Sequence, residues 1–174
     1  MEGRTIEFYA IEGNPVLAML SMKLQGFEFE VMGEKEYMKY YVEEGGFEPI
    51  RGHYADAGMD LRTPEDVVLR AHDSVVIDTK LHCCIPFGYY GKLESKSGLH
   101  VNHEIVCLGG VIDSGYEGSV KVKLYNMGAN LYKFHAGDKI VQMIIQPCVL
   151  EDWVVDDNFG GSERGSDGFG STGK

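Results

Sequence analysis

Cysteine motifs are missing from this 174-residue sequence. Its four cysteines lack the CxxC spacing of metal and redox sites and stand at Cys83, Cys84, Cys107 and Cys148. The adjacent pair Cys83 and Cys84 would point to opposite faces of a strand. The six histidines form neither an HExxH motif nor a Cys/His cluster, although His100 and His103 are close in sequence. We therefore expect reduced, mostly buried thiols and no structural zinc site.

Positive charge is also scarce, with 16 Lys and Arg residues against 27 Asp and Glu residues and a net charge of -11. No Lys/Arg run forms a basic patch, so the excess negative charge should repel nucleic acid and anionic membranes. The longest apolar run is far shorter than the ~20 residues that span a bilayer. The amino terminus lacks the basic and then apolar layout of a signal peptide. We expect a soluble, cytoplasmic protein with neither a nucleic acid nor a membrane as partner.

The composition indicates one domain with two appendages. Residues 1–40 form an acidic extension, in which Asn14-Pro15 and Gly26 are start and stop signals for a short helix over residues 16–25. Residues 41–155 form the main body. Residues 156–174 are so rich in glycine that they cannot build a core.

Short apolar segments bounded by turn residues recur along the chain and predict an all-β sandwich or barrel. In the extension, residues 5–11 and 27–32 alternate apolar residues with Glu and can add edge strands. The predicted strands of the body cover residues 37–42, 67–69, 74–78, 83–85, 89–93, 105–108, 120–125 and 139–146.

The stretch from Gly109 to Asn126 is predicted to form a β-hairpin, with an apolar strand end, a glycine-containing turn and an alternating run after it. Asp113 lies at the lip of its first strand and Tyr116 lies in its turn, so both can face a ligand. The alternative is structural: an Asp in a turn often bonds its own backbone, and a Tyr there is often a half-buried strut.

Three further polar features are candidates for binding. Lys96, Ser97 and Gly98 would converge on an anion if the segment ESKSG formed a tight turn. Asp60 follows a small-residue turn and either caps the next strand or supports a cation through water. Gln142 is a polar residue within an apolar strand and needs a partner.

The glycine-rich tail interleaves groups that suit a nucleotide. Glycines let backbone N–H groups approach an anion, hydroxyls donate to it, Arg offers a planar fork for phosphate, and Phe can stack on a base. A plain flexible linker is the alternative. The tail residues that carry the phosphate-clamp hypothesis are Arg164, Phe169, Gly170, Ser171 and Thr172.

Five segments, in order along the chain, resemble the five motifs of the homotrimeric dUTPases. They are AGMDL at residues 57–61, SKSGL at 95–99, GGVIDSGYEGSVKVKLYN at 109–126, GDKIVQMII at 137–145 and RGSDGFGSTG at 164–173. The third and fifth segments are long, and the order of all five is that of the family. The chain is therefore identified as a member of that family, of phage-like or bacterial type.

This resemblance implies a distorted jelly-roll β-barrel of β-clip type, closed into a homotrimer with active sites at the subunit boundaries. It also implies Mg²⁺-assisted hydrolysis of dUTP to dUMP and pyrophosphate, which keeps uracil out of DNA and supplies dUMP for dTMP synthesis. The compartment would be the cytoplasm of a bacterial cell or of a phage-infected host.

The resemblance also implies roles for the residues of the third motif. Asp113 would hold and activate the water that attacks the α-phosphorus, a general-base role that needs an ionised carboxylate. Tyr116 would lie beneath the deoxyribose and leave no room for a 2′-hydroxyl. The hairpin backbone would read the uracil edge, and the hairpin's other substrate-binding residues would be Gly110, Val111 and Lys121.

The other motifs would hold the triphosphate. By the same resemblance, Asp60 and Gln142 would also contact waters of the magnesium ion, which tends to keep part of its hydration shell. The tail would close from another subunit, stack on the base and hold the γ-phosphate. The phosphate-binding residues of the body would be Lys96, Ser97, Gly98 and Gln142.

Three features depart from the family pattern. Lys96 stands where Arg is usual, which keeps the charge but loses the bidentate fork. Cys107 stands where some members have an Asn that helps to read uracil. Residues 1–40 have no counterpart in the motifs.

Two other functions would fit the same fold. A dCTP deaminase needs a glutamate on the strand after the hairpin, where this chain has Lys123. A catalytically silent nucleotide-binding module would have lost turnover, which the presence of Asp113 and of the tail motif argues against.

Overall fold

Strands make up nearly all of the regular secondary structure of the computed structural model, which describes residues 38–157 and 160–161. The prediction of an all-β fold is confirmed, and one short helix interrupts the strands. The elements are β1 (Lys39–Val42), β2 (Met59–Arg62), β3 (Val67–Leu69), β4 (Ser74–Asp78), β5 (Leu81–Cys84), β6 (Tyr89–Ser95), α1 (Ser97–His103), β7 (Ile105–Leu108), β8 (Val111–Asp113), β9 (Lys121–Asn126), β10 (Tyr132–Phe134) and β11 (Lys139–Pro147).

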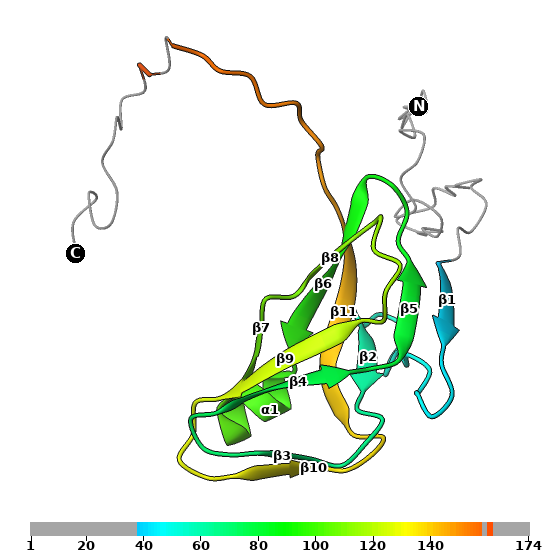
Figure 1. Cartoon of the computed structure of the whole chain (residues 1–174), viewed down its shortest axis with the longest axis vertical. Coiled ribbons are helices and arrows are strands. Elements are labelled where there is room, and N and C mark those ends of the chain that lie inside the picture. The colour runs from blue at the N-terminus through cyan, green and yellow to red at the C-terminus, as the bar shows by residue number, and fades with distance from the viewer. Residues whose placement is uncertain (1–37, 158–159, 162–174) are drawn as a thin grey trace, which may run out of the picture.

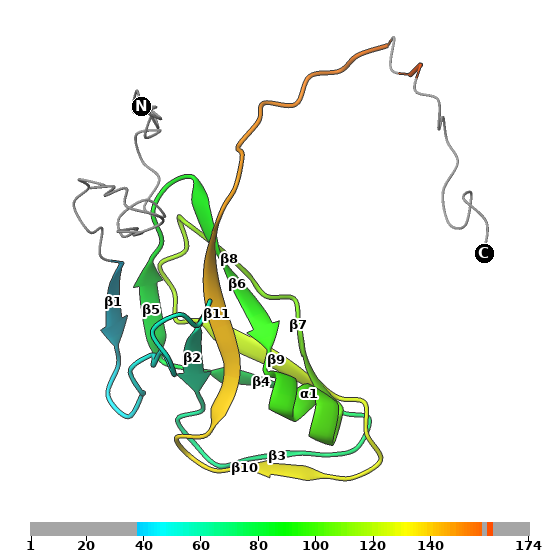
Figure 2. The same cartoon turned by 180° about the vertical axis from the view of Figure 1, so that it is seen from behind.

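The strands pair into two larger antiparallel sheets and two ribbons (Figure 1). One sheet has the order β2-β11-β6-β8 and the other has the order β4-β9-β7. The ribbons are β1-β5 and β3-β10. Figure 2 shows from behind how β11 runs beside β2 and β6, with α1 at one end of the sheet. This arrangement is consistent with the jelly-roll architecture expected from the sequence.

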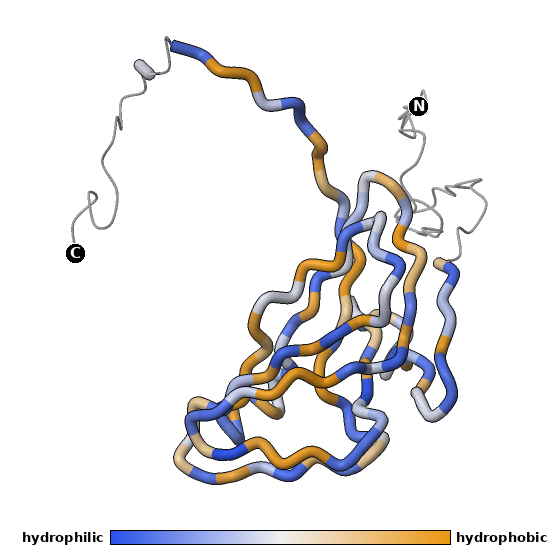
Figure 3. The backbone as a smooth tube through the Cα atoms, in the orientation of Figure 1, coloured by the Kyte–Doolittle hydropathy of each residue, from blue (hydrophilic) through white to orange (hydrophobic). Residues whose placement is uncertain are grey.

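Alternating side chains build the core between the sheets. In β9, Val122 and Leu124 are buried whereas Lys121 and Lys123 are exposed, because successive side chains of a strand point to opposite faces. The same alternation is visible along several strands in Figure 3. The core also contains Phe134 and Ile140, which are 1% and 0% exposed. Burial of these side chains from both sheets fixes the framework that carries the site residues.

The predicted β-hairpin of the third motif is wrong in its pairing. Both strands form, but β8 pairs with β6, whereas β9 pairs with β4 and β7. The connection between Asp113 and Lys121 is longer than the two-residue loops of tight hairpins, so it can pass from one sheet to the other. Alternation indicates which face of a strand is buried, and it does not identify the neighbouring strand. We call residues 113–120 the substrate turn.

The tight turn at ESKSG, on which the anion-site hypothesis for Lys96, Ser97 and Gly98 depended, does not form. The strand β6 runs to Ser95, and α1 begins at Ser97 with Lys96 as its N-cap residue. The helix buries only Leu99 and ends at His103, which is followed by the C-cap residue Glu104 with a left-handed φ of 57°. A helix of this length shows no clear apolar periodicity in the sequence, so it escapes pattern analysis. The short strand β10 was not predicted either.

The expectation of mostly buried cysteines is wrong as well. All four are free thiols, but only Cys83 is buried, Cys84 is exposed, and Cys107 and Cys148 are half-buried. Cys83 and Cys84 do point to opposite faces of β5. Burial raises the pKa of the Cys83 thiol to about 11. The strand pattern was correct here, but it could not tell that one face of β5 meets solvent.

The predictions for residues 5–11, 16–25 and 27–32 lie outside the described residues. Among the described residues, no helix combines the length and the apolar character needed to cross a membrane.

Candidate active site

Two of the predicted site residues of the body, Asp113 and Lys96, lie at opposite ends of β6 and mark two groups. Asp113 at the end of β8 is the cross-strand partner of Tyr90, near the start of β6. Lys96 follows directly after Ser95, the last residue of β6. At a rise of about 3.3 Å per residue, the strand from Tyr90 to Ser95 separates the two groups by roughly 16 Å. One chain therefore keeps its candidate water-activating carboxylate apart from its candidate phosphate-binding groups.

The first group is an ion-pair cluster around Asp60 on β2. Asp60 is 9% exposed, and its two carboxylate oxygens contact Lys96 Nζ at 2.5 Å and Lys139 Nζ at 2.8 Å. Burial alone would raise the pKa of Asp60, but hydrogen bonds from Lys139 and Lys96 bring that pKa below its ordinary value. Two ammonium groups against one carboxylate leave the cluster with net positive charge, which suits an anionic ligand.

Gln142 joins this cluster through strand register. It is the cross-strand partner of Asp60 on β11, and it is half-buried. A Cβ atom at Gly58 would lie 3.1 Å from Gln142 Oε1, so the glycine of AGMDL leaves room for the amide. Ser97 and Gly98 are exposed in the first turn of α1, beside Lys96. Asp60 therefore belongs to a charged cluster beside the start of α1, and this role replaces the capping alternative.

The second group is the substrate turn. Asp113 is exposed, and among the described residues its carboxylate has no hydrogen-bond partner. Its backbone carbonyl accepts from the Tyr116 N–H at 3.1 Å. The Tyr116 hydroxyl donates to the Ser119 carbonyl at 2.9 Å, while the residue remains 40% exposed. The hydroxyl of Tyr116 is thus held by a hydrogen bond within the turn, while part of its side chain remains accessible to a ligand.

Glycines shape the segment before β8, on one side of the second group. Gly109 and Gly110 have φ values of 73° and 100°, a region that favours glycine, and the Gly110 carbonyl accepts from the Leu93 N–H at 2.7 Å. Val111 is 64% exposed, and the Lys121 side chain also faces solvent. Cys107 is half-buried, and its N–H donates to Ser95 Oγ at 2.9 Å. The segment before β8 therefore offers backbone groups at an open edge.

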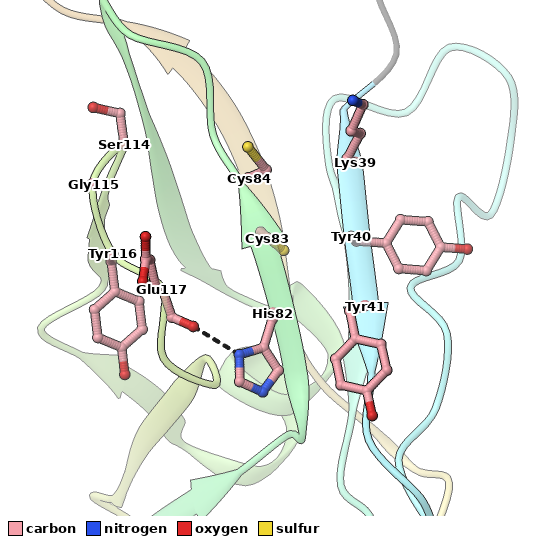
Figure 4. Close-up of a pocket in the computed structure, with 10 residues that line it drawn as sticks. All are labelled: Lys39, Tyr40, Tyr41, His82, Cys83, Cys84, Ser114, Gly115, Tyr116 and Glu117. Carbon is pink, nitrogen blue, oxygen red and sulfur yellow. Dashed lines mark hydrogen bonds between the residues drawn. The ribbon is translucent and has the colours of Figure 1, made fainter.

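A cavity of about 360 Å³ lies behind the substrate turn (Figure 4). Its wall on one side is formed by β1 and β5, and on the other side by residues 114–117. Tyr116 and His82 face each other across part of this space in Figure 4. The residues of the Asp60 cluster do not line the cavity.

The sequence profile of the dUTPase family matches residues 48–173 of the chain. The chain belongs to the dUTPase family. A deoxyuridine 5′-triphosphate nucleotidohydrolase of Paramecium bursaria Chlorella virus 1 is 38% identical over 130 residues, which are 75% of this chain and 92% of the viral protein. Family membership therefore rests on the core as well as on the short motifs.

Solved structures of phage dUTPases share the fold. The dUTPase of Staphylococcus bacteriophage 80alpha, with bound dUpNHpp, is 29% identical and superposes with a TM-score of 0.73 over 79% of this chain and 99% of the phage chain. A dUTPase from phage phi11 of S. aureus is 27% identical with a TM-score of 0.67, covering 71% of this chain and 99% of its own. The phi11 structure concerns the coordination of a structural Mg(II) ion.

Several groups in the site were not assigned a role from the sequence. Lys139 begins the predicted strand 139–146 and was given no role, yet it shares Asp60 with Lys96; its position in GDKIVQMII was the available signal. His82 and Asp78, which contact the substrate turn, carried no motif signal. The predicted tail residues Arg164, Phe169, Gly170, Ser171 and Thr172 lie outside the described residues.

Proposed function

We propose that this dUTPase-family enzyme hydrolyses dUTP to dUMP and pyrophosphate, in sites that two or more subunits of a homotrimer complete together. The observation that carries the shared site is the separation of Asp113 from Lys96 along β6. If both groups serve one reaction, one nucleoside triphosphate must place its α-phosphorus beside Asp113 and its phosphate chain on the Asp60 cluster. Within one chain these two positions are too far apart for that. The Asp60 cluster of a neighbouring subunit removes this conflict.

Asp113 is suited to act as the general base. It is exposed at the end of β8, with no described residue occupying its carboxylate. It would accept a proton as water oxygen bonds to the α-phosphorus, and the bond from that phosphorus to the bridging oxygen would break. The products are dUMP and pyrophosphate, and the role follows from the family resemblance together with this exposure.

The Asp60 cluster is suited to hold the phosphate chain. Lys96 and Lys139 are already directed to one point by Asp60, so little side-chain ordering is needed when an anion arrives. Ser97 and the Gly98 amide stand beside them at the start of α1, and Gln142 lies opposite Asp60. These groups provide charge from the lysines and hydrogen bonds from the remaining residues.

Magnesium fits this site only through its hydration shell. Among the described residues, no three His, Cys, Asp or Glu side chains form a cluster that could hold a metal ion. Both carboxylate oxygens of Asp60 contact lysine ammonium groups, so Asp60 is not free to bind a metal ion directly. Asp60 and the neighbouring Gln142 amide instead suit contacts to metal-bound water. The bound ion would supply neutralisation of phosphate charge. The phosphates themselves would provide its direct ligands.

Subunit association has support from the segment after β11. It leaves the body in Figure 1. Its large apolar side chains are exposed to solvent. Trp153, Val154 and Val155 are 93%, 86% and 95% exposed, and Val149 and Leu150 are 79% and 60% exposed. A run of this kind is typical of a surface that another chain covers. The tail residues beyond it would then reach a neighbouring subunit's nucleotide.

One assay separates this proposal from its rivals: product analysis with dUTP, dCTP, dTTP and UTP in parallel. We expect pyrophosphate from dUTP, with strong preference over the other three. Ammonia release from dCTP would indicate a deaminase, although Lys123 occupies the position that needs a glutamate. Nucleotide binding without any product would indicate a silent module. Equal rates on dUTP and UTP would contradict the proposed role of Tyr116.

A further inference from the structure

His82 lies on β5 and contacts the substrate turn through its ring. Its Nδ1 atom is 2.8 Å from the Glu117 carbonyl oxygen, and its Nε2 atom is 2.7 Å from Glu43 Oε1. Figure 4 shows the first of these bonds crossing from β5 to the turn. The Tyr41 ring lies 5.7 Å from the imidazole, centroid to centroid. A single side chain therefore connects the chain after β1 to the turn that carries Tyr116.

Both partners of the imidazole are hydrogen-bond acceptors. A carbonyl oxygen has no proton to give, and an ionised carboxylate has none either. Neutral histidine has only one N–H, so it can donate to Glu117 or to Glu43 but not to both. The imidazolium form has two N–H groups and satisfies both partners. Accordingly, the Glu117 carbonyl and then the Glu43 carboxylate raise the pKa of His82 above its ordinary value.

The charges around the ring favour the same form. Asp78 at the end of β4 adds a further negative charge that raises the pKa of His82. The nearby Lys80 is directed elsewhere, since its Nζ donates to the Glu44 carbonyl at 3.0 Å. Among the described residues, the titratable groups that face the ring or line its cavity come from four places: Lys39, Tyr40, Tyr41 and Glu43 from β1 and the residue after it, Asp78 from β4, Cys83 and Cys84 from β5, and Tyr116 and Glu117 from the turn.

The corner between β4 and β5 holds the far end of the turn independently of His82. Asp78 Oδ2 accepts from Ser119 Oγ at 2.9 Å. The Val120 N–H donates to the Leu81 carbonyl at 2.7 Å, and Thr79 Oγ1 donates to the Val120 carbonyl at 2.7 Å. At the other end, pairing of β8 with β6 fixes Asp113. His82 is thus the described side chain that holds the middle of the turn, next to Tyr116.

We propose that His82 is a positioning residue for the nucleotide: as imidazolium it ties Glu117 to Glu43 and thereby holds Tyr116 in its place beneath the deoxyribose. This inference rests on the proposed dUTP hydrolysis. The positioning role makes the affinity for substrate depend on pH, whereas the position of Asp113 does not change. Because the folded-state pKa of His82 is raised, the contribution of the imidazolium to holding Tyr116 is fully present below the ordinary pKa of histidine. This contribution is lost as pH rises through the raised pKa.

The test is the pH dependence of KM and kcat for dUTP, from about pH 6 to about pH 9, a window that spans histidine titration. In the unmodified protein, KM should rise about fivefold across the window, the scale of one net hydrogen bond, while kcat changes less. His82→Gln cannot become charged, so its KM should be raised at about pH 6 and lack this rise. His135→Gln is the matched control, because His135 is an exposed histidine paired with Asp66 at the far ribbon.

Glu43→Gln keeps an acceptor for Nε2 but removes the negative charge. The midpoint of the KM rise should therefore move to lower pH, and the His82 titration followed by NMR should move with it. This variant keeps the proposal testable if His82→Gln fails to fold.

A KM that rises in His82→Gln as it does in the unmodified protein would overturn the positioning role, and so would an unmoved midpoint in Glu43→Gln. In either case, dUTP turnover by the unmodified protein leaves the proposed function standing. Absence of turnover at every pH would overturn the proposed function and, with it, this inference.

Discussion

Asp113 and Lys96 are held at opposite ends of one strand, β6. The exposed carboxylate at one end and the lysine cluster at the other each form only part of a site. Within one chain the two groups do not contact each other. Each group can therefore be altered without disturbing the other. This separation makes their contributions to turnover distinguishable by mutation.

Asp113→Asn should reduce kcat for dUTP by ~10²-fold or more, the usual scale for loss of a general base. The fold and nucleotide binding should be nearly unchanged, because Asp113 is exposed and its strand pairing uses only the backbone. Steady-state kinetics, thermal unfolding and binding of dUpNHpp measure the three effects. A kcat within about fivefold of the parent protein would contradict the assignment of the base.

Gly118→Ala should displace the Tyr116 ring. A Cβ atom at position 118 would lie 2.5 Å from the Tyr116 hydroxyl oxygen and 2.6 Å from its ring carbon Cζ, which real contacts do not permit. We expect kcat/KM for dUTP to fall about tenfold, with weaker discrimination against UTP, because placement errors of this size are costly. Gly115→Ala is the matched control in the same turn, since no atom lies within 4 Å of its added Cβ. Equal effects of the two substitutions would argue against this placement of Tyr116.

Cys84 should react with iodoacetamide at about pH 8, whereas Cys83 should be protected. Cys84 is exposed on β5, and burial raises the pKa of Cys83 to about 11, so its reactive thiolate is scarce. Peptide mass spectrometry after timed labelling compares the two sites, which needs a cleavage or fragmentation that separates them. In denaturant the two thiols should react at similar rates. Faster labelling of Cys83 in the folded protein would show that this face of β5 is not buried.

Local patterns predicted the strands better than their partners. The apolar runs of β3, β4 and β7 carry their own turn residues, so their bounds followed directly from the sequence. The partner of β8 did not, because pairing with β6 depends on chain segments far away in sequence. The shared contact of Asp60 with Lys96 and Lys139 likewise depends on pairing between distant segments, that of β11 with β2 and with β6. Sequence patterns therefore predicted the strands of this chain but not how the strands pair.

The site could be predicted only as far as its motifs extend. Asp113, Tyr116 and Gln142 were singled out from local patterns and received their roles from the resemblance, and the structure places them without testing those roles. His82 could not be found this way, because its bond to Glu117 joins residues 35 positions apart with no recurring pattern between them. The helix after Lys96 was missed because its single buried residue, Leu99, leaves no periodic signal.

Shared sites are tested most directly by mixing two variants that we expect to be nearly inactive, Asp113→Asn and Lys96→Ala. Each variant alone lacks one half of every site. If one site takes Asp113 from one subunit and Lys96 from its neighbour, trimers refolded from an equal mixture regain intact sites, at about a quarter of all sites for random assembly. We predict that dUTP turnover by the refolded mixture will approach about a quarter of the rate of the identically refolded parent protein. Turnover no higher than the average of the two variants, in mixtures shown by native mass spectrometry to contain mixed trimers, would contradict the shared site.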